Sequence, residues 1–376
     1  MQVATVKTAD NKERYMLFDS NGESVDVVNR YLKYKDSYGS ARNTLKTYCY
    51  HLKLYFEYLE QSKLDFLDVN IDSMANFLHW LKNPLGSVNT IHLKPVESKR
   101  SAKSINIIVS VVLDFYDYLM RNSAYEGKII EQLKREMSGS RRGYKGFLYH
   151  ISKDKTYLAK TLRLKEPKKK PKTLQKRQVQ TLIENCLNIR DKFLITLLYE
   201  SGMRIGEVLG LWIEDFSIDG RKVEIKDRGE LENGAELKSV NAPRIIDISD
   251  NLINMFIDYI SEYHDDNVDT NFVFIKIAGE NKYQSMEYPD VDSLFKRLEK
   301  KTSFHALAHM LRHTSLTELR RAGMKSEHLQ RRAGHADPNF TAQTYYHPTE
   351  EDIRKDWENA SNKAKNWRYC GIIIEY

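Results

Sequence analysis

Histidines, arginines and tyrosines gather in two short segments near the end of the chain. His309 stands three residues before Arg312, and Gly334-His335 is followed by Tyr345-Tyr346-His347. A phenol is a weak nucleophile at neutral pH because its pKa is about 10, so an enzyme that uses one must remove its proton and stabilise charge on the electrophile. A phosphodiester carries that charge on its non-bridging oxygens, which a guanidinium can bind with two hydrogen bonds and a histidine can also bind. These residue types indicate phosphoryl transfer to tyrosine.

Two segments further upstream add an arginine and a lysine. Arg204 follows Ser201-Gly202-Met203 and stands three residues before Glu207, while Lys238 lies in a loop that leads to Arg244. An isolated Arg204 would most simply form a surface ion pair with Glu207. Lys226, in the preceding expected strand, competes with Lys238 as the functional lysine.

The order Arg, Lys, His-x-x-Arg, Gly-His, Tyr resembles that of the tyrosine recombinases, also called the phage integrase family. Each motif is common alone, but five in one order are not. The resemblance runs from about residue 25 onward and is strongest over residues 174–347. It is closest to the transposase-type members carried by bacterial site-specific transposons, through the stretch Gly-His-Ala-Asp-Pro-Asn at residues 334–339.

The resemblance implies a role for each of these residues. Arg204 and Arg312 would hold the scissile phosphate, Lys238 would protonate the leaving 5′ oxygen, and His309 would accept a proton or bind the phosphate. His335 would donate a hydrogen bond to the same phosphate. Tyr345 would be the nucleophile because it stands two residues before His347, as in the family pattern. Tyr346 is the alternative, since adjacent helical positions point about 100° apart and only one can face the phosphate.

No cofactor is expected. His305 and His309 are spaced like a zinc pair on a helix, but no glutamate base lies between them and no third ligand follows, so a metal site is not predicted. The chain has no Gly-x-x-x-x-Gly-Lys-Ser/Thr loop for ATP. The resemblance implies a 3′-phosphotyrosyl intermediate that conserves bond energy, and therefore a DNA strand transferase that needs neither metal nor ATP.

We expect a mainly α fold with a small β-sheet (α+β) in two domains. Residues 1–24 form an N-terminal extension with a turn at residues 19–22, between two short strands. Residues 25–164 form a helical core-binding domain, which the resemblance identifies as SAM-like and DNA-binding. Residues 165–172 are a basic linker because prolines and repelling lysines disfavour helix. Residues 173–376 are the catalytic domain, which ends in a C-terminal helix.

Hydrophobic periodicity predicts the elements of both domains. Four helices are expected in the first, the third of them capped by Asp72 or Ser73 and the fourth spanning residues 104–120. In the second, residues 190–201 form a helix that ends at Gly202, and two strands at 222–226 and 244–248 flank a loop that turns at Asn233-Gly234. Other helices are expected at residues 174–187, 251–263, 288–300, 304–322, 326–333 and 349–365.

The amino-acid composition limits the partners and the compartment that can be expected. The 376 residues include 59 Lys and Arg against 52 Asp and Glu, a net charge of +7 that permits a polyanionic partner. The 3 scattered cysteines suggest a reducing compartment, and no apolar run is long enough for a membrane span, so we expect a soluble intracellular protein.

The resemblance implies double-stranded DNA as the partner, a homo-tetramer on paired DNA sites, accessory recombination proteins, and a place on the nucleoid in the bacterial cytoplasm. The expected C-terminal helix, residues 350–367, would dock on a neighbouring protomer or pack against its own domain. Two rival functions remain open: a type IB-like topoisomerase, which reseals the same strand, and an inactive DNA-binding regulator with the same fold.

Overall fold

The chain divides into two compact units, Met1–Lys168 and Lys169–Tyr376. The computed structural model describes residues 1–9, 12–83, 99–122, 134–138, 156–160, 163–166, 172–237 and 242–335, together with Arg354, Trp357, Glu358 and Ser361. No helix in these ranges is long and apolar enough to cross a lipid bilayer. The mainly α fold with small antiparallel sheets that the sequence predicts is confirmed.

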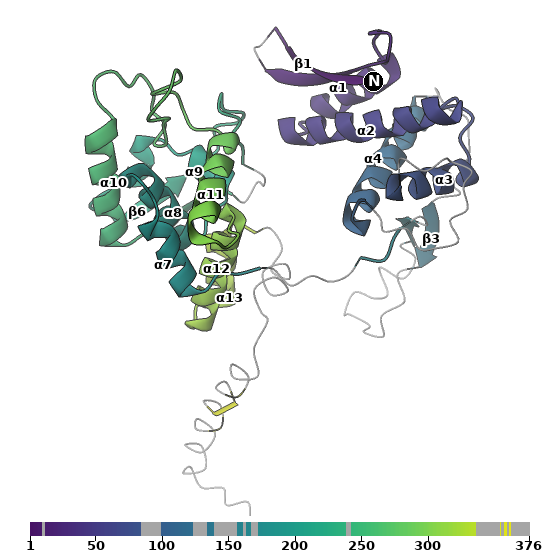
Figure 1. The fold of residues 1–376 in the computed structure, drawn as a ribbon. Coiled ribbons are helices and arrows are strands. Elements are labelled where there is room, and N and C mark those ends of the chain that lie inside the picture. The colour runs from purple at the N-terminus through teal and green to yellow at the C-terminus, as the bar shows by residue number, and fades with distance from the viewer. Residues whose placement is uncertain are drawn as a thin grey trace, which may run out of the picture. The chain divides into compact units, whose positions relative to one another are not determined.

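Within its described residues, the first unit has four helices and two antiparallel pairs of strands (Figure 1). Its elements are β1 (Gln2–Lys7), β2 (Glu13–Phe18), α1 (Asp26–Ser37), α2 (Arg42–Ser62), α3 (Ile71–Lys82), α4 (Ala102–Arg121), β3 (Lys134–Ser138) and β4 (Thr156–Lys160). Its core includes several buried tyrosines and phenylalanines among the aliphatic side chains, and the hydroxyls of Tyr55 and Tyr116 lie 2.6 Å apart. Burying such tyrosines requires partners for their hydroxyls, and Tyr116 donates to the carbonyl of Phe66.

The N-terminal residues pack on the helices of the first unit. Leu17 of β2 is fully buried in the helical core, and its backbone exchanges hydrogen bonds with the Asn29 side chain of α1. The predicted turn at residues 19–22 is present, but its position between two strands is wrong. The strands β1 and β2 join through residues 8–12, and the later turn only brings Ser24 back to a single bridge with Phe18.

The predicted cap of α3 is also wrong. Asn70, rather than Asp72 or Ser73, precedes the helix with an extended backbone, and its side chain accepts from the Ser73 amide at 2.9 Å. Three polar residues stand close together here, and only the one just outside the first helical turn can reach that amide. The hydrophobic periodicity predicts where the helix lies, but it does not show which of the three polar residues caps it.

The second unit carries the predicted motifs. Its elements are α7 (Lys176–Glu184), α8 (Ile189–Ser201), α9 (Ile205–Leu209), the 3₁₀ turn η1 (Ile213–Asp215), β5 (Phe216–Ser217), β6 (Lys222–Ile225), β7 (Arg244–Asp247), α10 (Asp250–Tyr263), α11 (Tyr288–Thr302), α12 (Ala308–Arg321) and α13 (Ser326–Ala333). Of the predicted C-terminal helix, Arg354, Trp357, Glu358 and Ser361 are described and are helical.

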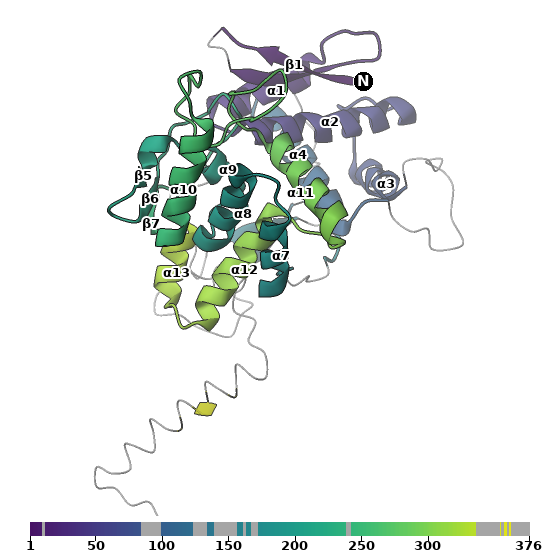
Figure 2. The ribbon, with the colours of Figure 1, turned by 60° about the vertical axis from the view of Figure 1, so that its left-hand side comes forward.

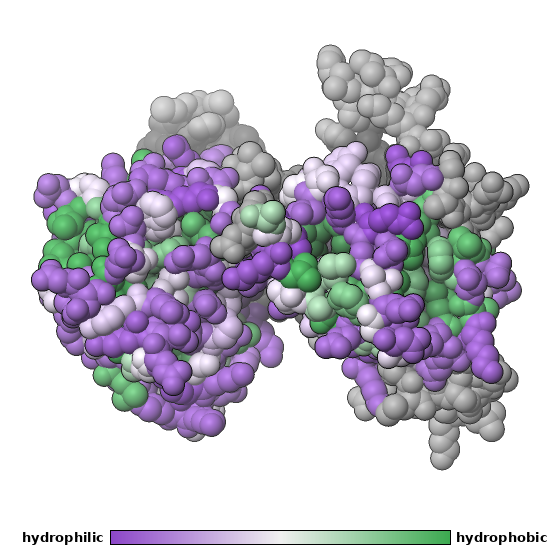
Figure 3. All heavy atoms as spheres, turned by 90° about the horizontal axis from the view of Figure 1, so that it is seen from above, coloured by the Kyte–Doolittle hydropathy of each residue, from purple (hydrophilic) through white to green (hydrophobic). Residues whose placement is uncertain are grey.

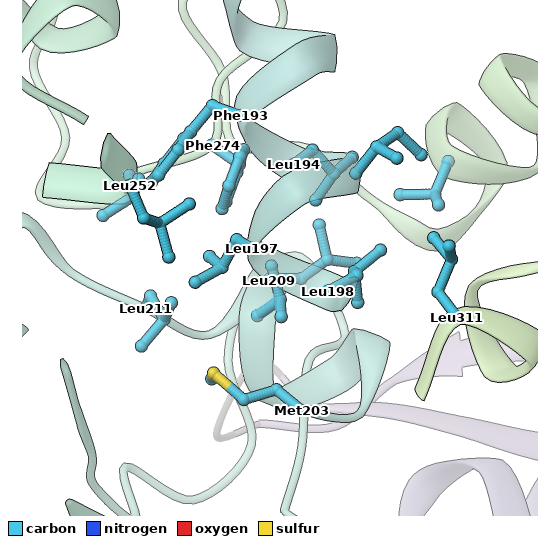
Figure 4. Packing of buried hydrophobic residues seen from close by; sticks show 14 of the residues in the cluster. Phe193, Leu194, Leu197, Leu198, Met203, Leu209, Leu211, Leu252, Phe274 and Leu311 are labelled. Carbon is cyan, nitrogen blue, oxygen red and sulfur yellow. The ribbon is translucent and has the colours of Figure 1, made fainter. Parts of the chain in front are cut away.

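Helix α8 is the centre of this unit. It packs against α10 and α12, and its residues are buried around most of its circumference (Figure 2). Figure 4 shows Leu194, Leu197 and Leu198 between Phe274 on one side and Leu311 of α12 on the other. A helix that is apolar on all sides belongs in a core. On the face that Figure 3 shows, hydrophilic residues cover most of the second unit, whereas the first unit also presents hydrophobic residues.

The two predicted strands are confirmed as the antiparallel pair β6 and β7, with Ile225 opposite Arg244. The sequence missed β5, whose 2 residues are too few to show an alternating pattern. In the loop between β6 and β7, Gly234 has a positive φ of 72°, and the Asn233 amide donates to the carbonyls of Leu209 and Met286. The predicted Asn-Gly turn is therefore anchored in the core.

The helix predicted at 304–322 begins later, at Ala308. Ser303 ends α11 in the left-handed conformation, and Leu307 has an extended backbone just before α12. Apolar residues continue through this connection, so periodicity alone overestimates the helix. The actual start places His309 in the first turn of α12.

Gly202 ends α8 as predicted, with a left-handed φ of 67°. A Cβ at this position would lie 3.2 Å from Leu316 and 3.3 Å from the hydroxyl of Ser315. We therefore expect Gly202→Ala to lower the free energy of unfolding by about 2 kcal/mol, from backbone strain plus crowding. Urea denaturation would measure this. The control is Gly229→Ala, which shares a positive φ but meets nothing within 4 Å, so it should cost only about 1 kcal/mol.

Candidate active site

Arg312 lies at the centre of the site. Its side chain projects from α12 and is only 1% exposed. Nη1 donates to the carbonyl of Gly202 at 2.6 Å, and Nη2 donates to the carbonyl of Ala333 at 2.7 Å. These bonds join the end of α8 to the end of α13, which brings two motifs that are far apart in the sequence to one place.

Arg204 reaches the same place from the start of α9. Its Nη1 donates to Ala333 and its Nη2 to Gly334, both at 3.4 Å from the carbonyl oxygens. The same Nη1 donates to Glu207 at 2.7 Å. The ion pair with Glu207 that would be the simple interpretation of an isolated arginine is therefore present, but it is part of a buried cluster rather than a surface contact.

Glu207 is the only carboxylate that the described ion pairs place among these arginines. Its side chain is 1% exposed, and it accepts from Arg204 and Arg244 and lies 4.0 Å from Arg312. Burial raises the pKa of Glu207, but the hydrogen bond and charge of Arg244, followed by the Arg204 amide and Arg312, bring it below its usual value. Three guanidiniums and one carboxylate leave the cluster positive, so it can attract an anion.

His335 completes the cluster. Its Nε2 lies 2.9 Å from Nη2 of Arg312. A guanidinium can only donate, so Nε2 accepts and the proton of the neutral ring is on Nδ1. Burial, followed by the charges of Arg312, Arg204 and Arg244, lowers the pKa of His335 to about 3. His335 is therefore a neutral hydrogen-bond donor through Nδ1 at physiological pH.

The buried histidines predict how stability depends on pH. The pKa of His335 is lowered to about 3 and that of His313 to about 4, in both cases first by burial. The unfolded chain therefore binds more protons below about pH 6.5, and stability falls as the pH decreases. Each histidine should account for about 2 kcal/mol of the loss between pH 7.5 and pH 5.

Urea unfolding at these two pH values tests the effect. His335→Gln should remove about 2 kcal/mol of the pH-dependent loss. An unaltered pH dependence in His335→Gln would contradict the expectation.

His309 lies on the exposed side of α12, with its ring edge-on to His313 and the ring centroids 4.2 Å apart. It shares a cavity of about 280 Å³ with the two arginines. The lining residues are Met203, Arg204, Ile205, Gly206, Glu236, Tyr288, Ala308, His309 and Arg312. The cavity is large enough for a phosphate group and is bordered by cations.

The zinc pairing of His305 with His309 is not favoured. The His305 ring instead lies 3.0 Å from the Glu299 carboxylate. Within the described ranges, no group of three or more His, Cys, Asp and Glu side chains could hold a metal ion.

Lys226, the competing lysine, is engaged elsewhere. Its ammonium lies 3.1 Å from Asp215, 3.6 Å from Glu224 and 3.9 Å from Glu214. The hydrogen bond with Asp215 raises the pKa of Lys226 above its usual value. A lysine held by carboxylates gives up its proton less readily, which favours Lys238. Lys238, Tyr345 and Tyr346 themselves lie outside the described residues, so their roles stay predictions.

The structure adds residues that the sequence did not single out. Glu236 and Tyr288 line the cavity, and Arg244 forms a buried ion pair with Glu207. For Arg244 a signal was available: it occupies an inward position of a strand with buried and exposed residues in alternation, where an arginine requires a buried partner. Tyr288 and Glu236 carry no comparable signal because their position depends on the packing of separate segments.

Comparison with known families gives two matches. The profile of the phage integrase family matches residues 172–352. The profile of the phage integrase N-terminal SAM-like domain matches residues 28–123. The first of these segments includes all six residues that the sequence predicts to be catalytic.

Curated relatives extend over nearly the whole chain. Transposase A from transposon Tn554 of Staphylococcus aureus is 34% identical over 343 residues, which covers 91% of this chain and 93% of the relative. Tyrosine recombinase XerD of Staphylococcus epidermidis is 25% identical over 340 residues, which covers 88% of this chain and 96% of the relative.

Solved structures share the fold at lower sequence identity. The Tn1549 transposon integrase, in complex with transposon right end DNA, is similar with a TM-score of 0.59 and 20% identity, over 89% of this chain and 99% of that chain. XerH site-specific recombinase, bound to palindromic difH substrate, gives a TM-score of 0.56 and 17% identity, over 89% of this chain and 83% of that chain.

Proposed function

Because the chain belongs to the phage integrase family of tyrosine recombinases, we propose that it is a site-specific recombinase or transposase that cuts and rejoins DNA strands through its own tyrosine. The observation that best supports this function is the meeting of Arg204, Arg312 and His335 beside one cavity that His309 also lines. These residues come from three motifs that are distant in the sequence, and each type is one that phosphoryl transfer needs.

In the proposed reaction, the phenol oxygen of Tyr345 attacks the scissile phosphorus. A bond forms to the tyrosine and the bond to the 5′ oxygen breaks, which yields a 3′-phosphotyrosyl link and a 5′-hydroxyl. His309 accepts the phenol proton or binds the phosphate, and Lys238 protonates the leaving oxygen, because an alkoxide is a poor leaving group. A 5′-hydroxyl from the partner strand then attacks the phosphotyrosyl link, which forms a new phosphodiester bond and releases the tyrosine.

The arginines and His335 stabilise the charge that develops on the phosphate. Guanidiniums held by buried carbonyls need no reorganisation during the reaction, and pre-oriented donors of this kind contribute strongly to catalysis. The cluster carries this charge stabilisation with protein groups alone. We therefore propose that strand transfer requires neither a metal ion nor ATP, since the phosphotyrosyl link conserves the energy of the broken bond.

We propose double-stranded DNA as the substrate, which is supported by the structurally similar Tn1549 integrase, solved in complex with transposon right end DNA, and XerH, solved bound to difH substrate. We propose assembly into a homo-tetramer on paired sites, together with accessory recombination proteins, on the nucleoid of a bacterial cytoplasm. We also propose, from the resemblance, that the C-terminal helix docks on a neighbouring protomer; Trp357, which is 68% exposed, is accessible for such a contact.

A nicked suicide duplex tests the reaction. The duplex carries a site that the protein selects by binding from a random-sequence pool, and cleavage next to the nick releases a short oligonucleotide that cannot religate. Full-length protein in EDTA and without ATP should form an adduct that survives denaturation and contains phosphotyrosine after proteolysis. Binding without any adduct would instead support the inactive regulator.

A second assay separates the topoisomerase. Two plasmids that carry the selected site should exchange strands to give recombinant products. Relaxation of a supercoiled plasmid without such a site, and no recombinants, would identify a topoisomerase. The relatives, which are transposases and recombinases, favour exchange.

A further inference from the structure

Arg244 is a third buried arginine of the cluster, and it does not touch the cavity. Its side chain projects inward from the first position of β7 and is only 3% exposed. Nη2 donates to Oε2 of Glu207 at 2.8 Å and Nη1 donates to Oε1 at 3.2 Å, so both carboxylate oxygens are held. The described lining of the cavity includes Arg204 and Arg312 but not Arg244. This guanidinium faces a protein partner rather than the phosphate.

Charge balance alone does not explain this pair. Glu207 already receives a hydrogen bond from Arg204 at 2.7 Å and has Arg312 at 4.0 Å. Adding a further cation to a buried cluster with a single carboxylate is electrostatically unfavourable. The bidentate geometry, however, fixes the plane of the carboxylate. In that plane Oε1 faces Nη1 of Arg204 and Oε2 accepts from the Arg204 amide at 2.8 Å.

A second contact connects Arg244 to the end of α13. Its Nε donates to the carbonyl of Arg332 at 2.7 Å. The next two carbonyls, those of Ala333 and Gly334, accept hydrogen bonds from Arg204, and the chain then enters His335. Arg332 in turn donates to the carbonyl of Asp247 in β7 at 3.2 Å. Helix α13 lies next to β7 in Figure 2, joined by this exchange.

We propose that Arg244 is a positioning residue for strand cleavage. Through Glu207 it orients Arg204 toward the phosphate, and through the Arg332 carbonyl it sets the turn that carries His335. This inference rests on the proposed strand-transfer function. It assigns a specific task to a residue that contacts neither the DNA nor the reacting atoms.

Loss of Arg244 should slow chemistry without weakening DNA binding. Displacement of a catalytic group by about 1 Å can cost about 100-fold in rate, whereas affinity comes mostly from many phosphate contacts. We expect Arg244→Met to lower the single-turnover cleavage rate at saturating suicide duplex by about 100-fold. Its Kd for the duplex, measured by fluorescence anisotropy, should stay within about threefold of the wild-type value.

Arg190→Met is the matched control. Arg190 also forms a buried ion pair, with Nη2 donating to Asp191 at 2.6 Å and Nη1 donating to the carbonyl of Ile275 at 3.1 Å, but it does not contact the cluster. Its loss should lower stability and leave the cleavage rate within about threefold, at a temperature where all variants are folded. An equal loss of rate in both variants would reduce Arg244 to a structural residue and overturn the inference.

Arg244→Lys gives a second test that preserves the buried charge. A lysine cannot bind both carboxylate oxygens and the Arg332 carbonyl in the same way, so we expect a cleavage rate about tenfold below that of the wild type, between the wild type and Arg244→Met. If Arg244→Met does not fold, this variant decides: a rate equal to that of the wild type overturns the proposal. An inactive wild-type protein would instead overturn the proposed function itself.

The dependence of the cleavage rate on pH provides a further test, because a loss of stability alone would not shift this profile. Arg244 is the largest of the influences that lower the pKa of Glu207, against the effect of burial. The other groups facing this carboxylate are Arg204 and Arg312, with His335 nearby. Arg244→Met should therefore raise the pKa of Glu207 and shift the acid limb of the profile to higher pH. The shift should be absent in Arg190→Met, and its absence in Arg244→Met would count against positioning through Glu207.

Discussion

Tyr345→Phe is expected to abolish the covalent protein–DNA adduct. Without the phenol oxygen no phosphotyrosyl link can form, and loss of the nucleophile in covalent catalysis costs a factor on the order of 10⁶, far below detection. DNA affinity should remain close to the wild-type value because many phosphate contacts determine it. Denaturing electrophoresis of the suicide-duplex reaction measures the adduct, and fluorescence anisotropy measures binding.

Tyr346→Phe is the matched control for the nucleophile. It changes the neighbouring residue in the same way and should keep at least about a third of the wild-type adduct, since only one of two adjacent tyrosines can face the phosphate. If Tyr346→Phe alone eliminated the adduct, the nucleophile would be Tyr346. A full adduct in both single variants would place the nucleophile elsewhere in the chain.

Glu207→Gln should strongly destabilise the second unit. The substitution preserves shape but removes the only carboxylate in the described cluster, which leaves Arg204, Arg244 and Arg312 to repel one another in a buried site. Removing one partner of a buried ion pair costs about 3–5 kcal/mol, because the remaining charge is uncompensated. Urea denaturation at pH 7.5 would measure the loss.

Glu214→Gln is the corresponding surface control. Glu214 pairs with Arg228 at 3.4 Å, but its side chain is 62% exposed. Solvent screens such pairs, so the change should stay within about 1 kcal/mol. If the Glu207→Gln protein were as stable as this control, the charges of the three guanidiniums would not need compensation by Glu207.

The sequence predicts the secondary structure of the second unit well where local chemistry decides it. Gly202 ends α8 because a left-handed terminus favours glycine, and the β6 and β7 strands flank an Asn-Gly turn. It fails where several local solutions are equivalent. Asn70, Asp72 and Ser73 are all good caps, and the apolar residues before Ala308 continue the helical period although the chain there is extended.

The candidate site, too, was predictable in some respects and not in others. Motif order indicated Arg204, His309, Arg312 and His335, and the structure brings these residues to the border of one cavity or into direct contact there. Apart from the Arg204–Glu207 ion pair, the partners of the arginines were not predictable, because most are main-chain carbonyls, which have no sequence signature. Arg244 was visible in the sequence only as a strand residue, and its contact with Glu207 spans 37 positions.

The carbonyl of Ala333 accepts hydrogen bonds from both Arg204 and Arg312. Every residue type supplies a carbonyl, so the amino acid at this position can drift during evolution to others of similar size while the two arginines keep their acceptor. An inserted or deleted residue between α12 and Gly334 would instead rotate the carbonyl away from them. Descendants of this protein should therefore conserve the length of that segment more strictly than its composition.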